Sequence, residues 1–538
     1  MPRPWTRTLV AAAVTVLAAG VIVQVPATAG ATCTPGADTN PGGQWPRMGY
    51  DFGQTRHQPA EHTIGRLQAP ILQPAWTFSV NDATGTQFNE VTGYPIVADS
   101  CLFVGSNGGP GKPGWVFALN ADGGDMVWKR QLSDGVYSTV AVDAGIVYAY
   151  VSRIGSPYLV ALDERDGRVL WQTSVESQPG TDAVASPIVY DGMVWVGVSG
   201  SAAEGDDATR FDFRGVSVLV QAGAAGGRVL AHTYSIPDDR WKQGTANAGG
   251  AIWSTISIDA DPSSPTRGFG FVGTGNPFNY DSEDPNTNAV LKIDLRRTVG
   301  GVQNPALGSI VGSYKGDVEE YFPALSDKAS CDENDPVGLF LAGFECGRLD
   351  LDFGAAPNLF VDRLGRRTVG VGQKSGVYHA FDPVTMQPRW KQLMGVPSAV
   401  GGIVGTAAFD GTALYVPHSI AGYLAALDRD TGTPKWASPS ADGVHWGNPV
   451  TSANGVVYSV DLKGFLDAYD SGTGAPLLHR PMSVGANTGA APTFSWGGVS
   501  VAHNTVYASV GVGLTSAAAG LPAMPDGFVI AFRPARTL

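Results

Sequence analysis

The sequence between residues 350 and 382 places charged side chains where β-strands do not need them. In "DLDFGAAPNLFVDRLGRRTVGVGQKSGVYHAFD", Asp350 and Asp352 precede one apolar run, and Lys374 stands close to two glycines before the next. A carboxylate can act as a general base or a cation ligand, and a lysine can stabilise developing negative charge. We therefore predict a site at Asp352 and Lys374, with Asp350 as a structural partner. The competing interpretation is that the aspartates form turns and that Lys374 is a surface lysine.

Two earlier segments carry further candidates. Glu204 follows a small-residue turn in "GVSGSAAEGDDATRFDFRG", Trp253 lies in "AIWSTISID", and Asn276 lies in "GTGNPFNYD". Two carboxylates and an amide, from Glu204, Asp352 and Asn276, suit a hard cation such as Ca²⁺. The alternatives are a solvated acidic loop at Glu204, ordinary core at Trp253 and a left-handed turn at Asn276.

A repeated phrase supplies the elements that must position these residues. It has the form G-x-ϕ-x-A-ϕ-D, where ϕ is apolar, followed by a polar turn and a short strand that closes with Trp. Clear copies start at Gly114, Pro157, Gly376, Gly422 and Gly464, weaker copies at Gly215 and Ala289, and a truncated copy at Gly527. Another strand pair precedes most copies, which makes four strands per unit. The pattern predicts an all-β fold, an eight-bladed β-propeller of four-stranded blades.

The truncated copy predicts how the ring closes. "GFVIAFRP" lacks the Trp-bearing strand, whereas "ILQPAWTFSV" near the N-terminus is such a strand without a preceding hairpin. We expect the segment around Trp76 to pair with the segment around Phe532 and complete one blade. The repeat tryptophans are predicted to pack between blades near the outer edge; they are Trp128, Trp171, Trp390 and Trp436.

Composition and the N-terminus indicate a secreted protein. Arg3 and Arg7 precede an apolar run and a small-residue segment, which is typical of a secretory signal peptide over residues 1–31; an uncleaved anchor is the alternative. No other stretch is apolar enough to span a membrane, so we do not expect an integral membrane protein. A net charge of -13 argues against a nucleic-acid partner. We expect an N-terminal extension over residues 32–65 and the propeller over residues 66–538.

Four cysteines in a secreted protein allow three disulfide connectivities. We favour Cys331–Cys346, because the loop between them is short and polar, and Cys33–Cys101 would then tie the N-terminal tail to the first strands. The sequence contains no CxxCH motif, so no covalently attached haem is expected.

The blade phrase A-x-D-x-x-T-G-x-x-x-W resembles that of the PQQ-dependent alcohol dehydrogenases, which are eight-bladed quinoprotein propellers. The motifs "AIWSTISID", "GTGNPF", "DLDFGAAPNL" and "GQKSGVYHAFDP" follow in the order of that family. The similarity is greatest to the polyvinyl-alcohol dehydrogenase branch and covers residues 45–534. The sequence departs from the family in having no adjacent cysteine pair and in having Ala251 where a threonine is expected.

The resemblance implies roles for individual residues. Glu204, Asn276 and Asp352 match the calcium ligands, and Asp352 also matches the catalytic base. Trp253 matches the tryptophan beneath the PQQ ring, and Lys374 the basic residue near the quinone oxygens. Gly354 stands where calcium enzymes have Ala or Gly and lanthanide enzymes have Asp. Arg153 and Arg214 are candidates for binding the cofactor carboxylates.

The implied activity is the oxidation of an alcohol, with PQQ and Ca²⁺ as cofactors and an external electron acceptor as partner. The substrate would be a small-molecule or polymeric alcohol. Two other interpretations compete with this one. The first is a non-enzymatic secreted propeller that acts as a binding or assembly module. The second is a propeller hydrolase or lyase that acts on polysaccharide, for which the sequence shows no matching pair of catalytic carboxylates.

Overall fold

A computed structural model describes most of the chain after the predicted signal peptide. The described residues are 32–86, 89–108, 112–204, 206, 208–241, 247–278, 283–318, 320–321, 351–397, 401–419, 422–439, 448–461, 464–482, 497–511 and 527–535. Residues 32–538 form one compact unit. Within the described residues, no helix has the length and apolar character needed to cross a membrane.

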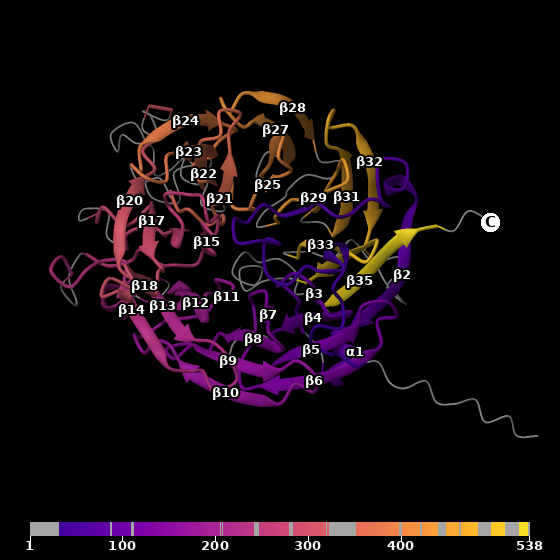
Figure 1. The fold of residues 1–538 in the computed structure, drawn as a ribbon, viewed down its shortest axis with the longest axis horizontal. Helices are drawn as coiled ribbons and strands as arrows, with labels where there is room; N and C mark the ends of the chain where they lie inside the picture. The colour runs from indigo at the N-terminus through magenta and orange to yellow at the C-terminus, as the bar shows by residue number, and fades with distance from the viewer. Residues whose placement is uncertain are drawn as a thin grey trace, which may run out of the picture. The chain divides into compact units, whose positions relative to one another are not determined.

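Eight antiparallel sheets form a ring, with the first strand of each sheet near the centre and the fourth at the periphery (Figure 1). The first four sheets contain β3 (Ile96–Ala98), β4 (Cys101–Ser106), β5 (Gly114–Asn120) and β6 (Met126–Leu132); β7 (Ala141–Asp143), β8 (Ile146–Val151), β9 (Tyr158–Asp163) and β10 (Val169–Ser174); β11 (Ile188–Tyr190), β12 (Met193–Val198), β13 (Val216–Gln221) and β14 (Val229–Tyr234); and β15 (Ser257–Ile258), β16 (Phe269–Gly273), β17 (Ala289–Asp294) and β20 (Ile310–Lys315). The next three contain β21 (Asn358–Val361), β22 (Arg367–Gly372), β23 (Val377–Phe381) and β24 (Pro388–Leu393); β25 (Ala408–Phe409), β26 (Ala413–His418), β27 (Tyr423–Asp428) and β28 (Pro434–Pro439); and β29 (Thr451–Ala453), β30 (Val456–Val460), β31 (Phe465–Asp470) and β32 (Pro476–Pro481). The predicted eight-bladed propeller is confirmed.

The eighth blade closes the ring as the sequence predicts. It contains β33 (Val499–Ala502), β34 (Thr505–Val510), β35 (Phe528–Pro534) and, from the other end of the chain, β2 (Leu72–Ser79). β2 and β35 pair antiparallel, with Trp76 opposite Ala531 and Pro74 opposite Phe532. Both ends of the propeller therefore share one sheet, which leaves no open blade edge at the junction.

Few other elements interrupt the described ring. They are the short strands β1 (His57–Gln58), β18 (Thr298–Val299) and β19 (Val302–Gln303), the helices α1 (Val80–Thr84) and α2 (Ser201–Glu204), and the 3₁₀ turns Pro41–Gly43, Ala69–Ile71 and Arg210–Asp212. In each blade the second strand is almost wholly buried, whereas the fourth is partly exposed, as β12 and β14 show. This gradient explains why the inner strands read as continuous apolar runs.

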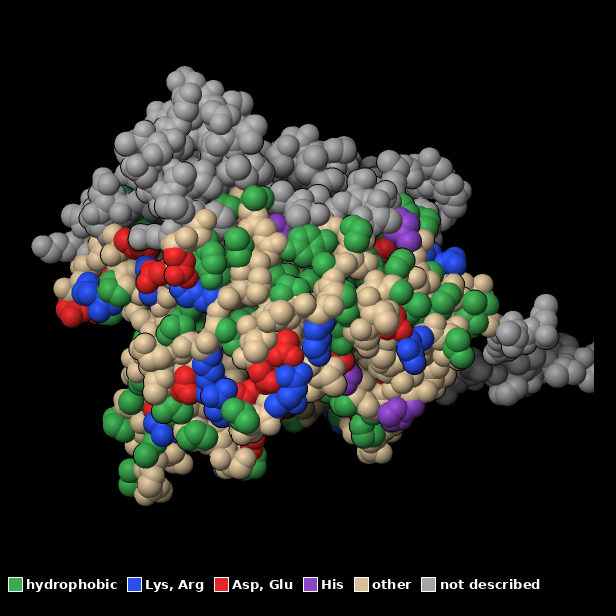
Figure 2. Space-filling model, turned by 90° about the horizontal axis from the view of Figure 1, so that it is seen from above, with side chains coloured by type: hydrophobic (Ala, Val, Ile, Leu, Met, Phe, Trp, Pro, Cys, Tyr) green, Lys and Arg blue, Asp and Glu red, His purple; other side chains and the backbone are tan. Residues whose placement is uncertain are grey.

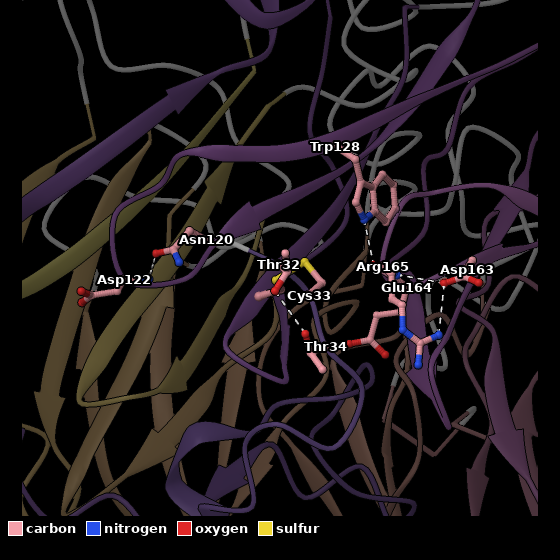
Figure 3. Close-up of a disulfide and its surroundings, with 10 residues drawn as sticks. Thr32, Cys33, Thr34, Asn120, Asp122, Trp128, Asp163, Glu164 and Arg165 are labelled. Atoms are coloured by element: carbon pink, nitrogen blue, oxygen red, sulfur yellow. Dashed lines mark hydrogen bonds and ion pairs between the residues drawn. A yellow bond between two sulfur atoms is a disulfide. The ribbon is translucent and has the colours of Figure 1, made fainter. Parts of the chain in front are cut away.

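The repeat tryptophans join neighbouring blades, as predicted. The indole N–H of Trp128 donates to the carbonyl oxygen of Glu164 in the next blade, with an N–O distance of 2.8 Å (Figure 3). A Cβ atom at Gly167 would lie 2.5 Å from the same indole, so the ring packs directly on that glycine. Trp171 and Trp436 make corresponding bonds to Gly223 and Ser471, and the indole of Trp390 packs on Gly432.

The segment Trp45–Gln58 contacts the first strand of every blade. In six blades a backbone carbonyl of the segment accepts a hydrogen bond from a backbone amide of the first strand, and β1 pairs in parallel with β29. In the other two blades the contact is the Phe52–Tyr190 ring contact and a bond from the Gln58 side-chain amide to the carbonyl of Val501. The contacts, in ring order, are Trp45–Val97, Pro46–Val142, Phe52–Tyr190, Phe52–Ile258, Gly53–Leu359, Thr55–Phe409, Arg56–Ser452 and Gln58–Val501. Residues that we placed in an N-terminal extension thus cover strand edges that face the centre of the ring.

Cys33 and Cys101 form a disulfide, which confirms that pair (Figure 3). It links the start of the described chain to the first residue of β4. The favoured pair, Cys331–Cys346, lies outside the described residues, as does Asp350.

Acidic and basic side chains lie side by side on the face drawn in Figure 2. Among the described residues, ion pairs such as Arg363–Asp428 also bring opposite charges together.

Candidate active site

Three of the predicted site residues meet in one cluster. The indole N–H of Trp253 donates to Oδ2 of Asp352 at 3.1 Å, and Nζ of Lys374 lies 3.2 Å from the same oxygen. Nζ of Lys374 also lies 5.4 Å from the centre of the Trp253 ring. The Asp352 side chain is 7% exposed and that of Lys374 is 14% exposed. A buried carboxylate, an ammonium and an indole therefore share one location, although none belongs to the repeated phrase.

Backbone contacts hold Asp352 between two blades. The amide of Phe353 donates to the carbonyl of Thr274, directly after β16, at 3.1 Å. The amide of Lys374, two residues after the end of β22 in the next blade, donates to the carbonyl of Asp352 at 3.0 Å. Ser254 adds a bond from its hydroxyl to the carbonyl of Ala355 at 3.0 Å. Both neighbouring blades thus hold the backbone that carries the carboxylate.

A buried network supports the turn that carries Lys374. Oε1 of Gln373 accepts the hydroxyl of Ser375 at 2.6 Å and lies 3.1 Å from Nε2 of His379, whose other nitrogen lies 3.0 Å from the Tyr314 hydroxyl. Burial, followed by the charge of Lys391, lowers the pKa of His379 to about 3. The imidazole is therefore neutral near pH 7 and serves as a hydrogen-bonding support for the turn.

Glu204 and Asn276 form a second contact. Nδ2 of Asn276 donates to Oε1 of Glu204 at 3.0 Å. Asn276 is buried, whereas Glu204 is exposed at the end of α2. Asn276 does not have a positive φ, so it does not form the left-handed turn that was the alternative. Glu204 thus contacts one predicted site residue while its own side chain is exposed.

Blade topology places the five candidate residues at one face of the ring; they are Glu204, Trp253, Asn276, Asp352 and Lys374. In an antiparallel meander, the connection between the second and third strands lies at the same end as the entry to the first. Glu204, Asn276 and Lys374 lie in such connections, after β12, β16 and β22, and Trp253 and Asp352 precede the first strands β15 and β21. Three consecutive blades therefore contribute to the cluster.

The chemical types of the residues present are suitable for binding a hard cation and a planar cofactor. Glu204, Asn276 and Asp352 offer carboxylate and amide oxygens, which Ca²⁺ prefers. The bond between Phe353 and Thr274 brings the Asp352 segment beside the strand end that continues to Asn276. A half-buried indole, with a carboxylate and an ammonium beside it, provides a flat surface for an aromatic ring.

Gly354 has a packing role that the sequence did not reveal. A Cβ atom at this position would lie 1.9 Å from Cη2 of Trp253. The glycine therefore lets the indole lie against the backbone next to Asp352. The family resemblance relates Gly354 only to the choice between calcium and lanthanide ions. In the sequence, the one feature that indicates the close packing of Trp253 on the backbone is the glycine two residues after Asp352.

The two arginine candidates have other contacts in this structure. Arg214 is buried, donates to the carbonyl of Ile236 at 2.7 Å and pairs with Asp238 at 2.5 Å. Arg153 is exposed and donates to Ser156 at 3.3 Å. Neither contact joins an arginine to Trp253, Asp352 or Lys374.

The sequence is similar to a protein-family model and to known proteins. A family model named PQQ_2, described as outer membrane protein assembly factor BamB, matches residues 61–229 and 372–517. A polyvinylalcohol dehydrogenase of Pseudomonas sp is 28% identical over 79% of this chain and 65% of its own length. A polyvinylalcohol dehydrogenase of Sphingopyxis sp. (strain 113P3) is 28% identical over 72% of this chain and 57% of its own length. The chain thus spans 65% and 57% of the lengths of these relatives.

The solved structure of a quinohemoprotein alcohol dehydrogenase from Comamonas testosteroni superposes with a TM-score of 0.65 at 16% identity. The superposition covers 92% of this chain and 81% of that one, which shows a shared fold. The family model spans more than half of the sequence; its matched ranges include Glu204 and Lys374, whereas Trp253, Asn276 and Asp352 lie between them. The chain therefore belongs to the PQQ_2 family, and its resemblance is to the quinoprotein alcohol dehydrogenases within that group of propellers.

Proposed function

We propose that this protein is a secreted quinoprotein oxidoreductase that oxidises an alcohol, with PQQ and Ca²⁺ as cofactors and an external electron acceptor. Secondary and polymeric alcohols are the first substrates to test, because two relatives that cover 79% and 72% of this chain are named polyvinylalcohol dehydrogenases. The contact of Trp253 and Lys374 with the buried carboxylate of Asp352 is the observation that carries the proposal. The Cys33–Cys101 disulfide supports secretion, since disulfides persist in oxidising compartments.

The proposed roles rest on the family resemblance and on the contacts between these residues. Asp352 accepts the hydroxyl proton of the alcohol as a general base, and the ammonium of Lys374 stabilises its charged form. Lys374 also supplies positive charge where an oxyanion develops. Glu204, Asn276 and Asp352 would hold Ca²⁺, and Trp253 would support the cofactor ring. PQQ, when bound, supplies the electrophilic quinone that accepts the hydride.

A direct test combines the purified protein with PQQ and Ca²⁺. We expect a changed ultraviolet-visible spectrum of the cofactor and alcohol-dependent reduction of an artificial dye. Primary, secondary and polymeric alcohols should be compared, with omission of PQQ as the control. Failure to bind the cofactor, together with no dye reduction for any alcohol, would refute the proposal. It would favour a binding or assembly module, which the description of the family model supports as the second candidate.

A further inference from the structure

Three metal-ligating side chains lie together in the blade of β29–β32, which the proposed active site does not use. Asp461 follows β30, Asp467 lies in β31, and His479 lies in β32. Their ligand atoms all lie within 4.8 Å of one another. It is the single such group of His, Cys, Asp and Glu in the part of the chain that the structure describes. Nδ1 of His479 lies 2.7 Å from Oδ1 of Asp467, so two of the three already touch.

The burial of Asp461 and Asp467 makes it energetically unfavourable for both carboxylates to be charged without a cation. Asp461 is 0% exposed and Asp467 is 1% exposed, whereas the His479 side chain is 31% exposed. Two neighbouring buried carboxylates repel each other and lose hydration. The ring of Phe465 stacks on that of His479 with a centroid distance of 4.1 Å and an interplanar angle of 5°. This packing holds the imidazole with its Nδ1 towards the acids.

The repeat itself does not require an acid at this place. In every blade, the residue at the position of Asp467 lies directly opposite a residue of the outermost strand, here His479. In the other seven blades the corresponding residues are Phe117, Val160, Val218, Leu291, His379, Ala425 and Ile530. None of these is acidic, so packing of a blade does not explain Asp467.

We propose that Asp461, Asp467 and His479 bind a divalent transition-metal ion of the zinc class. Imidazole nitrogen and carboxylate oxygen together suit Zn²⁺, and three protein ligands leave a fourth position for water. Two carboxylates balance the charge of the ion. A histidine ligand disfavours Ca²⁺, which takes oxygen ligands, so this site differs in chemistry from the proposed calcium site. The ion would tie β32 to the connection between β30 and β31.

A second histidine–carboxylate pair provides a matched control. His232 in β14 has the same position in its blade as His479, opposite Val218 of the third strand. Its Nε2 lies 2.9 Å from Oε2 of Glu176, and the side chains are 30% and 5% exposed. The corresponding values for His479 and Asp467 are 31% and 2%. The His232 pair is not part of any three-residue group among the described residues.

The test is metal binding by the full-length, tag-free protein after treatment with a chelator and without PQQ. Zn²⁺ binding is measured by calorimetry, and Co²⁺ binding by visible absorption. We expect one ion per chain in the wild type and in His232→Ala, and excess Ca²⁺ should not displace it. His479→Ala and Asp467→Asn should each weaken binding at least about tenfold, because even the loss of a residue that only supports a metal ligand typically costs about 10–100-fold in affinity.

Three results would overturn the site: no Zn²⁺ bound by the wild type, unchanged binding in both variants, or equal weakening in His232→Ala. Circular dichroism checks that each variant is folded. Asp467→Asn preserves the shape of the side chain, so it carries the test if His479→Ala does not fold. Because the readout is binding of a metal alone, the outcome does not depend on alcohol oxidation or on PQQ.

Discussion

The indole N–H groups of Trp128 and Trp253 donate hydrogen bonds to different kinds of acceptor. Both indoles lie against a glycine, Gly167 and Gly354 respectively, and both N–H groups donate a hydrogen bond. The acceptor for Trp128 is a backbone carbonyl in the next blade, and the ring is only 8% exposed. The acceptor for Trp253 is the side-chain carboxylate of Asp352, and this ring is half-buried.

The difference separates residues that hold the ring together from residues that can act on a ligand. A backbone carbonyl is present whatever the sequence, so an indole bound to it needs only the repeat geometry. A carboxylate beside an ammonium has to be encoded and is costly to bury. Substitutions at the outer tryptophans should therefore affect stability, and substitutions at the inner cluster should affect activity. The predictions below test this separation.

Asp352→Asn should have the largest effect. It preserves the shape of the side chain and an acceptor for the Trp253 indole but removes the base. We expect alcohol oxidation in the presence of PQQ and Ca²⁺ to fall by about 10²–10⁴-fold, with little change in the melting temperature. Steady-state dye reduction and thermal unfolding measure the two effects.

Asp382→Asn is the control for this variant. Asp382 follows β23 in the same blade, where it holds a turn and pairs with Arg389 at 2.6 Å. We expect wild-type activity and a small loss of stability. If Asp352→Asn retained full activity while binding PQQ, the assignment of the base would be wrong.

Trp128→Ala should show the opposite behaviour. Removal of a buried indole that packs between blades is expected to cost about 3–5 kcal/mol of unfolding free energy. Activity per folded molecule should be unchanged, because Trp128 lies in a blade that contributes no residue to the site cluster. Denaturant unfolding gives the free energy, and dye reduction at low temperature gives the activity. A selective loss of activity without destabilisation would contradict the separation of the two kinds of tryptophan.

The fold was predictable because its signals are local. Strand alternation, turn residues and the closing tryptophan recur within each blade, and the incomplete copy identified the junction of β2 and β35. The path of Trp45–Gln58 was not predictable, since its contacts join residues as far apart as Gln58 and Val501. No periodic pattern encodes such pairings.

The site was predictable in part. Sequence motifs selected Asp352, Trp253 and Lys374, but nothing local showed that the indole of Trp253 would donate to a carboxylate 99 residues away. The group of Asp461, Asp467 and His479 was missed because Asp467 and His479 lie within an ordinary blade phrase and Asp461 lies just before it. Only the strand register shows that an acid replaces an apolar or neutral residue there.

Lys374→Ala should reduce the rate without unfolding the blade. Loss of positive charge near a developing oxyanion is expected to cost about 3 kcal/mol in the barrier, which is about 10²-fold in rate. Lys391→Ala in the same blade is the control. Its ammonium contacts the carbonyl of Asp317 at 2.8 Å and Glu320 at 3.3 Å, so only a small stability change is expected. Equal rates for both lysine variants would exclude Lys374 from the chemistry.

Gly354→Ala should have a smaller effect on the rate than Asp352→Asn or Lys374→Ala, and an effect that is specific to the packing of Trp253. The added Cβ would lie 1.9 Å from Cη2 of Trp253, so the indole has to move. Gly354 does not have a positive φ, so the backbone itself tolerates alanine. Displacement of a side chain of this kind costs about 1–3 kcal/mol. We expect altered tryptophan fluorescence and weaker PQQ binding, with either Ca²⁺ or a lanthanide ion. If Gly354 mattered only for the choice between Ca²⁺ and a lanthanide ion, alanine would serve calcium binding as well as glycine does, and the tryptophan fluorescence would not change.

Gly472→Ala is the control, because a Cβ there would meet nothing closer than 3.3 Å. Unchanged PQQ affinity in Gly354→Ala would show that the close packing of Trp253 on the backbone is not needed for the cofactor.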